Sequence, residues 1–167
     1  KLSADIYLGL GANLGDPLAT FNKCLSYIQK YAKLVSCSKL YRSAPFGFLD
    51  QPPFHNAAVR MSTDLSPLNL LKKLQETEKS LGKKVIRENG PRIIDLDLLL
   101  DDEITMKQDE LTLPHPRILD RDFVLRPLLD LNPKISHPAW CDNTAKSALC
   151  GLRDNFILGE PNPWVQP

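Results

Sequence analysis

Residues 88–103 read ENGPRIIDLDLLLDDE, a stretch in which two carboxylates, Asp95 and Asp97, interrupt an apolar run. If residues 93–100 form a strand, alternate side chains lie on opposite faces, so the two acids share one face and the apolar residues that alternate with them share the other. On a helix with 3.6 residues per turn, the two acids would point about 200° apart. The spacing therefore predicts a strand with one face in the core and two acids side by side on the other.

The segments around this stretch predict an α+β fold. Predicted strands cover residues 5–10, 32–43, 55–63 and 93–100, and predicted helices begin at Asp16-Pro17 and at Ser66-Pro67. The order β-α-β-β-α-β is that of a ferredoxin-like core with an antiparallel sheet. We expect both helices on one face of the sheet, with the other face free for a site. A short return strand over 110–113 and a short helix near 144–152 are also expected.

Length and composition predict a single domain, with a core over about 5–132 and a C-terminal extension over 133–167. The formal net charge of +1 argues against a nucleic acid or a membrane surface as partner. No apolar run approaches the roughly 20 residues that span a bilayer. The four cysteines are too widely spaced for a zinc site or a redox pair, which favours reduced thiols in a cytoplasmic protein. A monomer is expected because no apolar stripe is left unexplained. The proline-rich end is either a linker or a tail on which Trp164 packs back against the domain.

The acid pair predicts a metal site. Two neighbouring carboxylates repel each other, and burying them without a partner costs free energy. A divalent cation removes both problems, and the hard oxygen ligands favour Mg²⁺ together with phosphate. The simpler alternative is a solvated strand that carries two acids.

Basic residues near the acid pair predict contacts with a polyphosphate. Arg92 lies three residues before Asp95, and the loop that precedes it carries Lys83, Lys84 and Arg87. Such a loop can share the charge of the phosphates with the metal and close over them. Downstream, His115 is fixed between two prolines, and two arginines follow it, Arg117 and Arg121.

The loop over 44–57, APFGFLDQPPFHNA, combines aromatic rings with an amide. A single phenylalanine is more often part of the core. Several rings close to Asn56 can instead stack on a flat heterocycle while the amide bonds its edge. The loop therefore indicates a site for such a heterocycle.

Four segments together resemble one family, the 6-hydroxymethyl-7,8-dihydropterin pyrophosphokinases of folate biosynthesis. They are YLGLGANLGD over 7–16, DQPPFHNAAV over 50–59, GPRIIDLDLLL over 90–100 and LPHPRILDRDFVLRPL over 113–128. The resemblance runs from about Ile6 to Asn132. It implies transfer of the β,γ-pyrophosphoryl group of ATP to the hydroxymethyl oxygen of the pterin, with release of AMP.

The resemblance also implies roles for individual residues. Asp95 and Asp97 would hold two Mg²⁺ ions. The catalytic residues would be Arg92, Arg87, Lys83 and Asp97. The residues that bind the co-substrate ATP would be Gln75, Glu78, Arg92, Leu98, Thr112, His115, Arg117 and Arg121. The residues that bind the pterin would be Ser43, Ala44, Phe46, Phe54, Asn56, Asp95 and Phe123, with the rings of Phe54 and Phe123 on its two faces.

Two positions depart from the family pattern. Many relatives carry a tryptophan before the GPR motif, where this chain has Asn89. An arginine commonly follows the glycine that ends the second helix, where this chain has Lys83. Lysine lacks the bidentate fork of arginine, so the basic loop can act differently here.

Two other kinds of protein stay open at this point. A two-metal phosphodiesterase or nuclease also uses paired acids, but it needs further acids and a basic groove. A ferredoxin-like regulatory or ligand-binding module needs no acid pair, so replacing both acids would leave its ligand binding intact. The resemblance adds that this activity is fused to other folate enzymes in some organisms, so the chain can be one domain of a larger protein.

Overall fold

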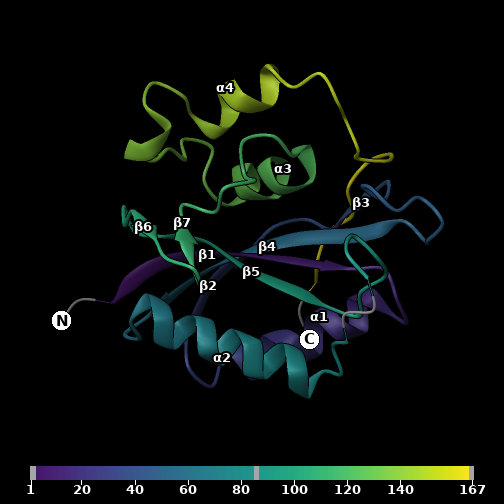
Figure 1. The fold of residues 1–167 in the computed structure, drawn as a ribbon, viewed down its shortest axis with the longest axis horizontal. Coiled ribbons are helices and arrows are strands. Elements are labelled where there is room, and N and C mark those ends of the chain that lie inside the picture. Colours follow the sequence, from purple (N-terminus) through teal and green to yellow (C-terminus); the bar gives the residue numbers. More distant parts are fainter. Residues whose placement is uncertain (1–2, 85–86, 166–167) are drawn as a thin grey trace.

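In the computed structural model, which describes residues 3–84 and 87–165, an antiparallel sheet lies between two pairs of helices (Figure 1). The strands are β1 (Ala4–Ala12), β2 (Lys33–Cys37), β3 (Tyr41–Ser43), β4 (Phe54–Thr63), β5 (Asp95–Asp101), β6 (Met106–Lys107) and β7 (Thr112–Leu113). The helices are α1 (Pro17–Ile28), α2 (Pro67–Ser80), α3 (Asp122–Leu131) and α4 (Ala145–Cys150), with a 3₁₀ turn over Pro138–Trp140.

The main sheet has the strand order β2-β4-β1-β5, with β3 paired to β4 beyond the end of β2. Each of these pairings is antiparallel. Strand β1 is central, because it pairs with β4 on one side and with β5 on the other. The α+β class and the antiparallel sheet are as predicted. A separate hairpin pairs β6 with β7, where the return strand was expected.

The first two helices begin where their capping residues predict. The Asp16 carboxylate accepts a hydrogen bond from the backbone N–H of Ala19 at 3.1 Å, and Ser66 Oγ accepts one from Asn69 at 3.3 Å. These bonds satisfy N–H groups that the first helical turn leaves without partners. Pro17 and Pro67 occupy that turn, where a missing N–H costs nothing.

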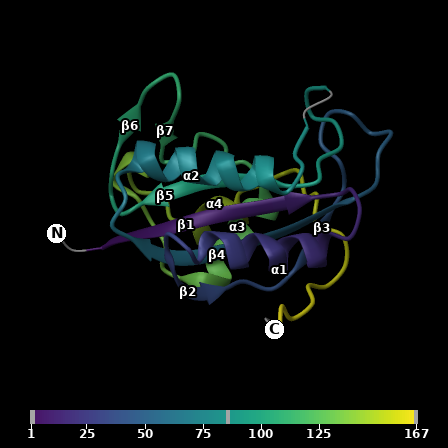
Figure 2. The ribbon, with the colours of Figure 1, turned by 90° about the horizontal axis from the view of Figure 1, so that it is seen from below.

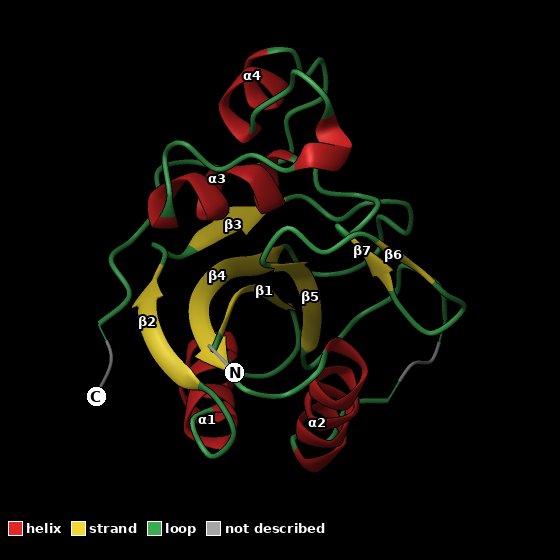
Figure 3. Ribbon diagram, turned by 90° about the vertical axis from the view of Figure 1, so that its left-hand side faces the viewer, coloured by secondary structure: helices red, strands yellow, loops and turns green. Residues whose placement is uncertain are grey.

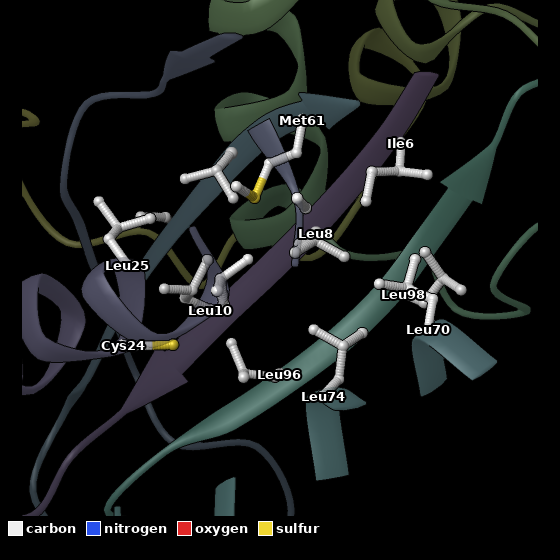
Figure 4. Packing of buried hydrophobic residues seen from close by; sticks show 14 of the residues in the cluster. Ile6, Leu8, Leu10, Cys24, Leu25, Met61, Leu70, Leu74, Leu96 and Leu98 are labelled. Carbon is white, nitrogen blue, oxygen red and sulfur yellow. The ribbon is translucent and has the colours of Figure 1, made fainter. Parts of the chain in front are cut away.

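The principal core lies between the sheet and the helices α1 and α2, which both cross its lower face (Figure 2). Leucines of β1 and β5 pack there against Leu70 and Leu74 of α2 (Figure 4). Leu96 and Leu98 are 5% and 3% exposed, which confirms that this side of β5 is the apolar face.

The expectation that helices cover one face only is wrong. Helix α3 lies on the opposite face of the sheet, and α4 lies beyond it (Figure 3). Leu125 and Leu128 of α3 pack there against Leu99 and Leu100. These two consecutive residues both face α3 because a bulge shifts the pairing of β5 with β1. The sequence interpretation predicts no helix over 122–131, because it uses this stretch only as part of the family motif that contains Phe123.

Strand boundaries also differ from the prediction, most clearly in two places. The strand expected over 32–43 is split into β2 and β3, since Ser38 bonds Ala58 through its hydroxyl as well as its backbone and bends the chain between them. Strand β5 begins at Asp95 rather than at residue 93. Among the described residues, no helix is long and apolar enough to cross a membrane.

Candidate active site

The register of three strands builds the floor of a pocket on the upper face of the sheet. Gly11 of β1 lies opposite Asn56 of β4 on one side and opposite Asp95 of β5 on the other. Gly9 likewise lies between Ala58 and Asp97. Residues directly opposite in an antiparallel sheet point to the same side, with neighbouring strands about 4.8 Å apart. Asn56 and the acid pair therefore stand on one surface with only glycine between them.

Gly9 and Gly11 are pocket residues that the sequence interpretation did not assign. A β-carbon at Gly9 would lie 3.3 Å from Leu99 Cδ1, and one at Gly11 would lie 3.7 Å from Asn56 Oδ1. A larger side chain at either position would fill the floor between the acids and the amide. The signal was present in the sequence, because glycine at alternate positions of a strand marks close approach of a ligand or another chain.

Ten of the predicted site residues line this one pocket. They are Ser43, Ala44, Phe46, Phe54, Asn56, Arg92, Asp95, Asp97, Arg121 and Phe123. They come from β3, β4, β5, the start of α3 and the loops that follow β3 and precede β5. The pocket thus joins an aromatic and amide end to an end that carries the carboxylates and guanidinium groups.

The two carboxylates differ in their surroundings. Asp95 forms ion pairs with Lys83 Nζ at 2.8 Å and with Arg92 Nε at 3.7 Å. None of the ion pairs among the described residues includes Asp97. The Asp97 side chain is exposed to solvent in the pocket, and desolvation by the surrounding pocket wall together with the charge of Asp95 raises its pKa to about 6. The arrangement leaves a negative charge in the pocket that a bound cation would stabilise.

Lys83 links the end of α2 to the acid pair. Its ammonium contacts Glu78 Oε2 at 2.7 Å as well as Asp95 Oδ1. Glu78 Oε2 also accepts the backbone N–H of Leu96 at 2.8 Å. Burial alone lowers the pKa of Lys83, but its bonds to Asp95 and Glu78 outweigh this and raise it. Lys83 is therefore a charged group that partly neutralises Asp95.

Replacing Glu78 with alanine is expected to lower the free energy of unfolding by about 2 kcal/mol, because the buried N–H of Leu96 would lose its acceptor and the Lys83 ammonium would keep only Asp95 of its two carboxylate partners. Urea denaturation measures the change. The matched control is Glu76→Ala on the same helix, whose side chain is 68% exposed and forms an ion pair with Lys73 at 3.6 Å. Equal midpoints for the two variants would contradict the prediction.

Arg92 braces the loop in front of β5. Its guanidinium donates hydrogen bonds to the carbonyl oxygens of Gly90 at 2.7 Å, Pro91 at 3.1 Å and Arg87 at 3.1 Å. Its backbone N–H donates to Asn13 Oδ1 at 2.8 Å, and Asn13 Nδ2 donates to the Pro52 carbonyl at 2.9 Å. Asn13, which the sequence interpretation did not assign, thus ties the loop after β1 to both loops that border the pocket.

Arg121 brings a second guanidinium to the pocket. It lies 5.6 Å from the ring centroids of both Phe46 and Phe123. Its Nε is buried and has no hydrogen-bond partner among the described atoms. Burial and the nearby Arg117 lower the pKa of its guanidinium. A buried donor of this kind favours an anionic or carbonyl oxygen entering the pocket.

Comparison with known proteins gives the decisive match. The family model for 7,8-dihydro-6-hydroxymethylpterin-pyrophosphokinase (HPPK) matches residues 7–133. The chain belongs to the HPPK family. This match includes every residue assigned to the pocket above, whereas residues 134–167 lie outside it.

Relatives with curated names agree with this assignment. The chain is 34% identical to the 2-amino-4-hydroxy-6-hydroxymethyldihydropteridine pyrophosphokinase of Aquifex aeolicus, covering 90% of this chain and 99% of that protein. It is 38% identical to the folic acid synthesis protein FOL1 of Dictyostelium discoideum, over 80% of this chain. That match covers only 20% of the Dictyostelium protein, so the chain spans about a fifth of that relative's length.

Solved structures agree in fold. The crystal structure of wild-type Plasmodium falciparum HPPK-DHPS with pterin and p-hydroxybenzoate has a TM-score of 0.72 to this chain at 15% identity. The alignment covers 90% of this chain and 42% of the Plasmodium chain. At this identity the likeness concerns the fold alone.

The other residues predicted from the HPPK resemblance lie outside the pocket lining among the described residues. They are Gln75, Glu78, Lys83, Arg87, Leu98, Thr112, His115 and Arg117. Gln75 is exposed on α2, and Thr112 is half-buried on β7. The Leu98 side chain is buried in the core below the sheet, so a ligand contact from this residue would use its backbone.

Arg87 and Asn89 bring the loop before β5 against the loop after β3. The Arg87 guanidinium lies 3.8 Å from the centroid of the Phe48 ring, and Gln51 Nε2 donates to the Asn89 carbonyl at 2.7 Å. Asn89 has φ +54° and lies against Gly47, where a β-carbon would approach Asn89 Nδ2 to 2.7 Å. The small residue at 47 is thus needed for this contact. The adjacent residues 85–86 lie outside the described residues.

His115 is held as a neutral ring. Its Nδ1 accepts the backbone N–H of Arg117 at 3.2 Å, which leaves the proton of the neutral ring on Nε2. Burial, with the charges of Arg121 and Arg117, lowers its pKa to about 4. At neutral pH, Nε2 can therefore donate one hydrogen bond to a phosphate oxygen.

The depressed pKa of His115 predicts a specific pH dependence of stability. Between about pH 4 and the ordinary histidine pKa of about 6.5, the unfolded chain binds a proton that the folded ring rejects. The stabilisation by neutral His115 is therefore complete above pH 6.5 and is lost as the pH falls toward 4. NMR titration of its Cε1 proton, with His115→Gln for assignment, is expected to give a midpoint near 4. A midpoint near 6.5 would contradict this.

Proposed function

We propose that this chain transfers the β,γ-pyrophosphoryl group of ATP to the hydroxymethyl oxygen of 6-hydroxymethyl-7,8-dihydropterin and releases AMP. The observation that carries the proposal is the shared floor of β4, β1 and β5. It sets Asn56 and the acid pair on one surface, separated by Gly9 and Gly11. A heterocycle bonded at Asn56 would extend its substituent toward Asp95 and Asp97.

The acid pair fits Mg²⁺. Its two carboxylates face the pocket, Asp97 has no ion-pair partner among the described residues, and desolvation together with the charge of Asp95 raises the pKa of Asp97. The described residues offer no group of three or more His, Cys, Asp or Glu arranged for a metal, so the remaining ligands would be phosphate and water oxygens. When bound, Mg²⁺ neutralises phosphate charge and makes the attacking hydroxyl more acidic. We infer two Mg²⁺ ions at this pair, as the family resemblance implies.

The protein's own contribution is positioning. Arg92 and Arg121 carry positive charge to the pocket, and Arg87 and Lys83 approach it from the loop before β5. These groups would hold the transferred phosphates in line with the hydroxyl, which is what phosphoryl-type transfer requires. His115 and Arg117, with Gln75, Glu78, Leu98 and Thr112, would form the outer nucleotide site.

The aromatic end of the pocket would bind the pterin. Phe54 and Phe123 would stack on its two faces, with Asn56 at its edge. Ser43, Ala44 and Phe46 would surround it, and Asp95 would lie near its hydroxymethyl group. This assignment follows the family pattern and the lining of the pocket.

Several broader features are part of the same proposal. The strand order β2-β4-β1-β5 supports a ferredoxin-like core. We infer one pyrophosphokinase domain, with a core over about 5–132 and an extension over 133–167, acting as a cytoplasmic monomer. Relatives with names such as folate synthesis bifunctional protein support fusion to other folate enzymes in a longer protein.

The test is to incubate the protein with ATP, Mg²⁺ and the pterin and to identify the nucleotide product by chromatography. AMP that forms only when the pterin is present is the expected result. ADP would mean transfer of a single phosphoryl group and would overturn the proposal. Cleavage of a nucleic acid without AMP formation would favour a nuclease, and pterin binding that survives loss of both acids without turnover would favour a regulatory module.

A further inference from the structure

The chain beyond the HPPK match returns to the pocket. After α4, residues 153–165 run past β3 and end beside α1 (Figure 1). This C-terminal segment pairs with the outer edge of β3. Phe156 accepts the backbone N–H of Ala44 at 2.8 Å, and Leu158 donates its own to Arg42 at 2.8 Å. The segment thus covers a strand edge that would otherwise expose its polar groups.

Side chains fix the segment at both ends. The Asp122 carboxylate, 2% exposed, accepts the backbone N–H groups of Phe156 at 2.8 Å and Ile157 at 3.0 Å. At the far end, Trp164 packs 5.8 Å from the Phe21 ring and donates from Nε1 to Asn22 Oδ1 at 2.9 Å. Asp122 lies between Arg121 and Phe123 in the chain, so the first tie connects the segment directly to the pocket wall.

The Phe156 ring packs against two rings that line the pocket, those of Phe46 and Phe123. Its centroid lies 5.7 Å from that of Phe46, with an interplanar angle of 60°, and 6.0 Å from that of Phe123, at 76°. These are tilted and edge-on contacts, the favourable arrangements for aromatic pairs. Phe46 and Phe123 line the pocket, whereas Phe156 is absent from the described residues that line it. The contacts of Phe156 with the pocket lining therefore run through these two rings.

We propose that Phe156 is a positioning residue for the heterocycle site and that the C-terminal segment is a working part of the pocket wall. The proposal rests on the proposed function, because it takes the pterin to be the heterocycle. Phe156 holds Phe123 at the angle required for stacking and keeps Phe46 packed beside it. A binding ring that lacks support on its outer side loses its fixed orientation, and affinity falls without any lost contact to the ligand.

The test compares three variants by calorimetric titration with the pterin, in the presence of Mg²⁺ and a non-hydrolysable ATP analogue. Phe156→Ala is expected to raise the Kd of the pterin about tenfold, because two aromatic contacts are lost. Phe156→Leu keeps an apolar side chain but has no aromatic ring, so its Kd for the pterin is expected to lie between those of wild type and Phe156→Ala. Leu158→Ala, a change of an exposed side chain on the same segment, is the matched control with unchanged affinity.

Further readouts separate positioning from a general loss of structure. The Kd of the ATP analogue and the kcat at saturating pterin are expected to stay within about twofold of wild type in Phe156→Ala. An unchanged pterin Kd, or a parallel loss of ATP-analogue affinity, would overturn the positioning role. If wild type binds the pterin but forms no AMP, the proposed function fails while the Kd comparison still decides the role of Phe156. If wild type does not bind the pterin, both proposals are overturned.

Discussion

Asp97→Asn is expected to reduce pyrophosphoryl transfer by about a thousandfold or more in kcat. The change keeps the size and shape of the side chain but replaces a charged oxygen ligand with a neutral amide. A charged metal ligand stabilises a phosphoryl-type transition state by several kcal/mol. A thousandfold loss in kcat corresponds to about 4 kcal/mol of lost stabilisation. AMP formation measured over a range of Mg²⁺ concentrations tests the prediction.

The same variant is not expected to unfold the protein. Desolvation by the pocket wall and the charge of Asp95 raise the pKa of Asp97 to about 6, so the ionised form at pH 7 slightly destabilises the ligand-free fold, an effect that solvent weakens because the side chain is exposed. Asp97→Asn removes this repulsion, and its melting temperature without ligand is expected to equal or exceed that of wild type. Asp109→Asn, an exposed change in the turn between β6 and β7, is the matched control with full activity. Near-normal kcat in Asp97→Asn would contradict the metal role.

Asn56→Ala is expected to weaken pterin binding by about a hundredfold. Asn56 is 6% exposed and donates from Nδ2 to Ser43 Oγ at 2.6 Å, so its side chain is fixed before a ligand arrives. Alanine would remove about two hydrogen bonds to the heterocycle at roughly 1–3 kcal/mol each and leave Ser43 without this donor. A loss of about 3 kcal/mol in binding free energy corresponds to the expected hundredfold rise in the Kd of the pterin.

The measurement for Asn56→Ala is a titration with the pterin, together with one for the ATP analogue. The Kd of the analogue is expected to change little, because Asn56 lies across β1 from the acid pair. Asn143→Ala, at an exposed position near α4, serves as the control. An equal loss of affinity for both ligands would mean that the change disturbs the whole sheet rather than the edge of the heterocycle.

The sequence alone was sufficient for the features that depend on local chemistry. Alternation of acids and leucines predicted the two faces of β5, and the cap residues Asp16 and Ser66 predicted the starts of α1 and α2. The pairing of the acids with GPR and PH-x-R motifs identified the family. These signals lie within a few residues of one another, so strand alternation, helix capping and motif spacing record them directly.

Only the tertiary structure determined which distant residues meet. Strand register places Asn56, Gly11 and Asp95 in one row. A bulge turns both Leu99 and Leu100 toward α3. Helix α3, which the sequence interpretation does not predict, covers part of the upper face of the sheet. The proline-rich end is compatible with a linker or a packed tail in sequence alone, and the contact of Trp164 with Phe21 shows the packed tail. The register of strand pairing and the path of the C-terminal segment depend on many packing contacts between residues far apart in the chain. A local sequence pattern does not contain this information.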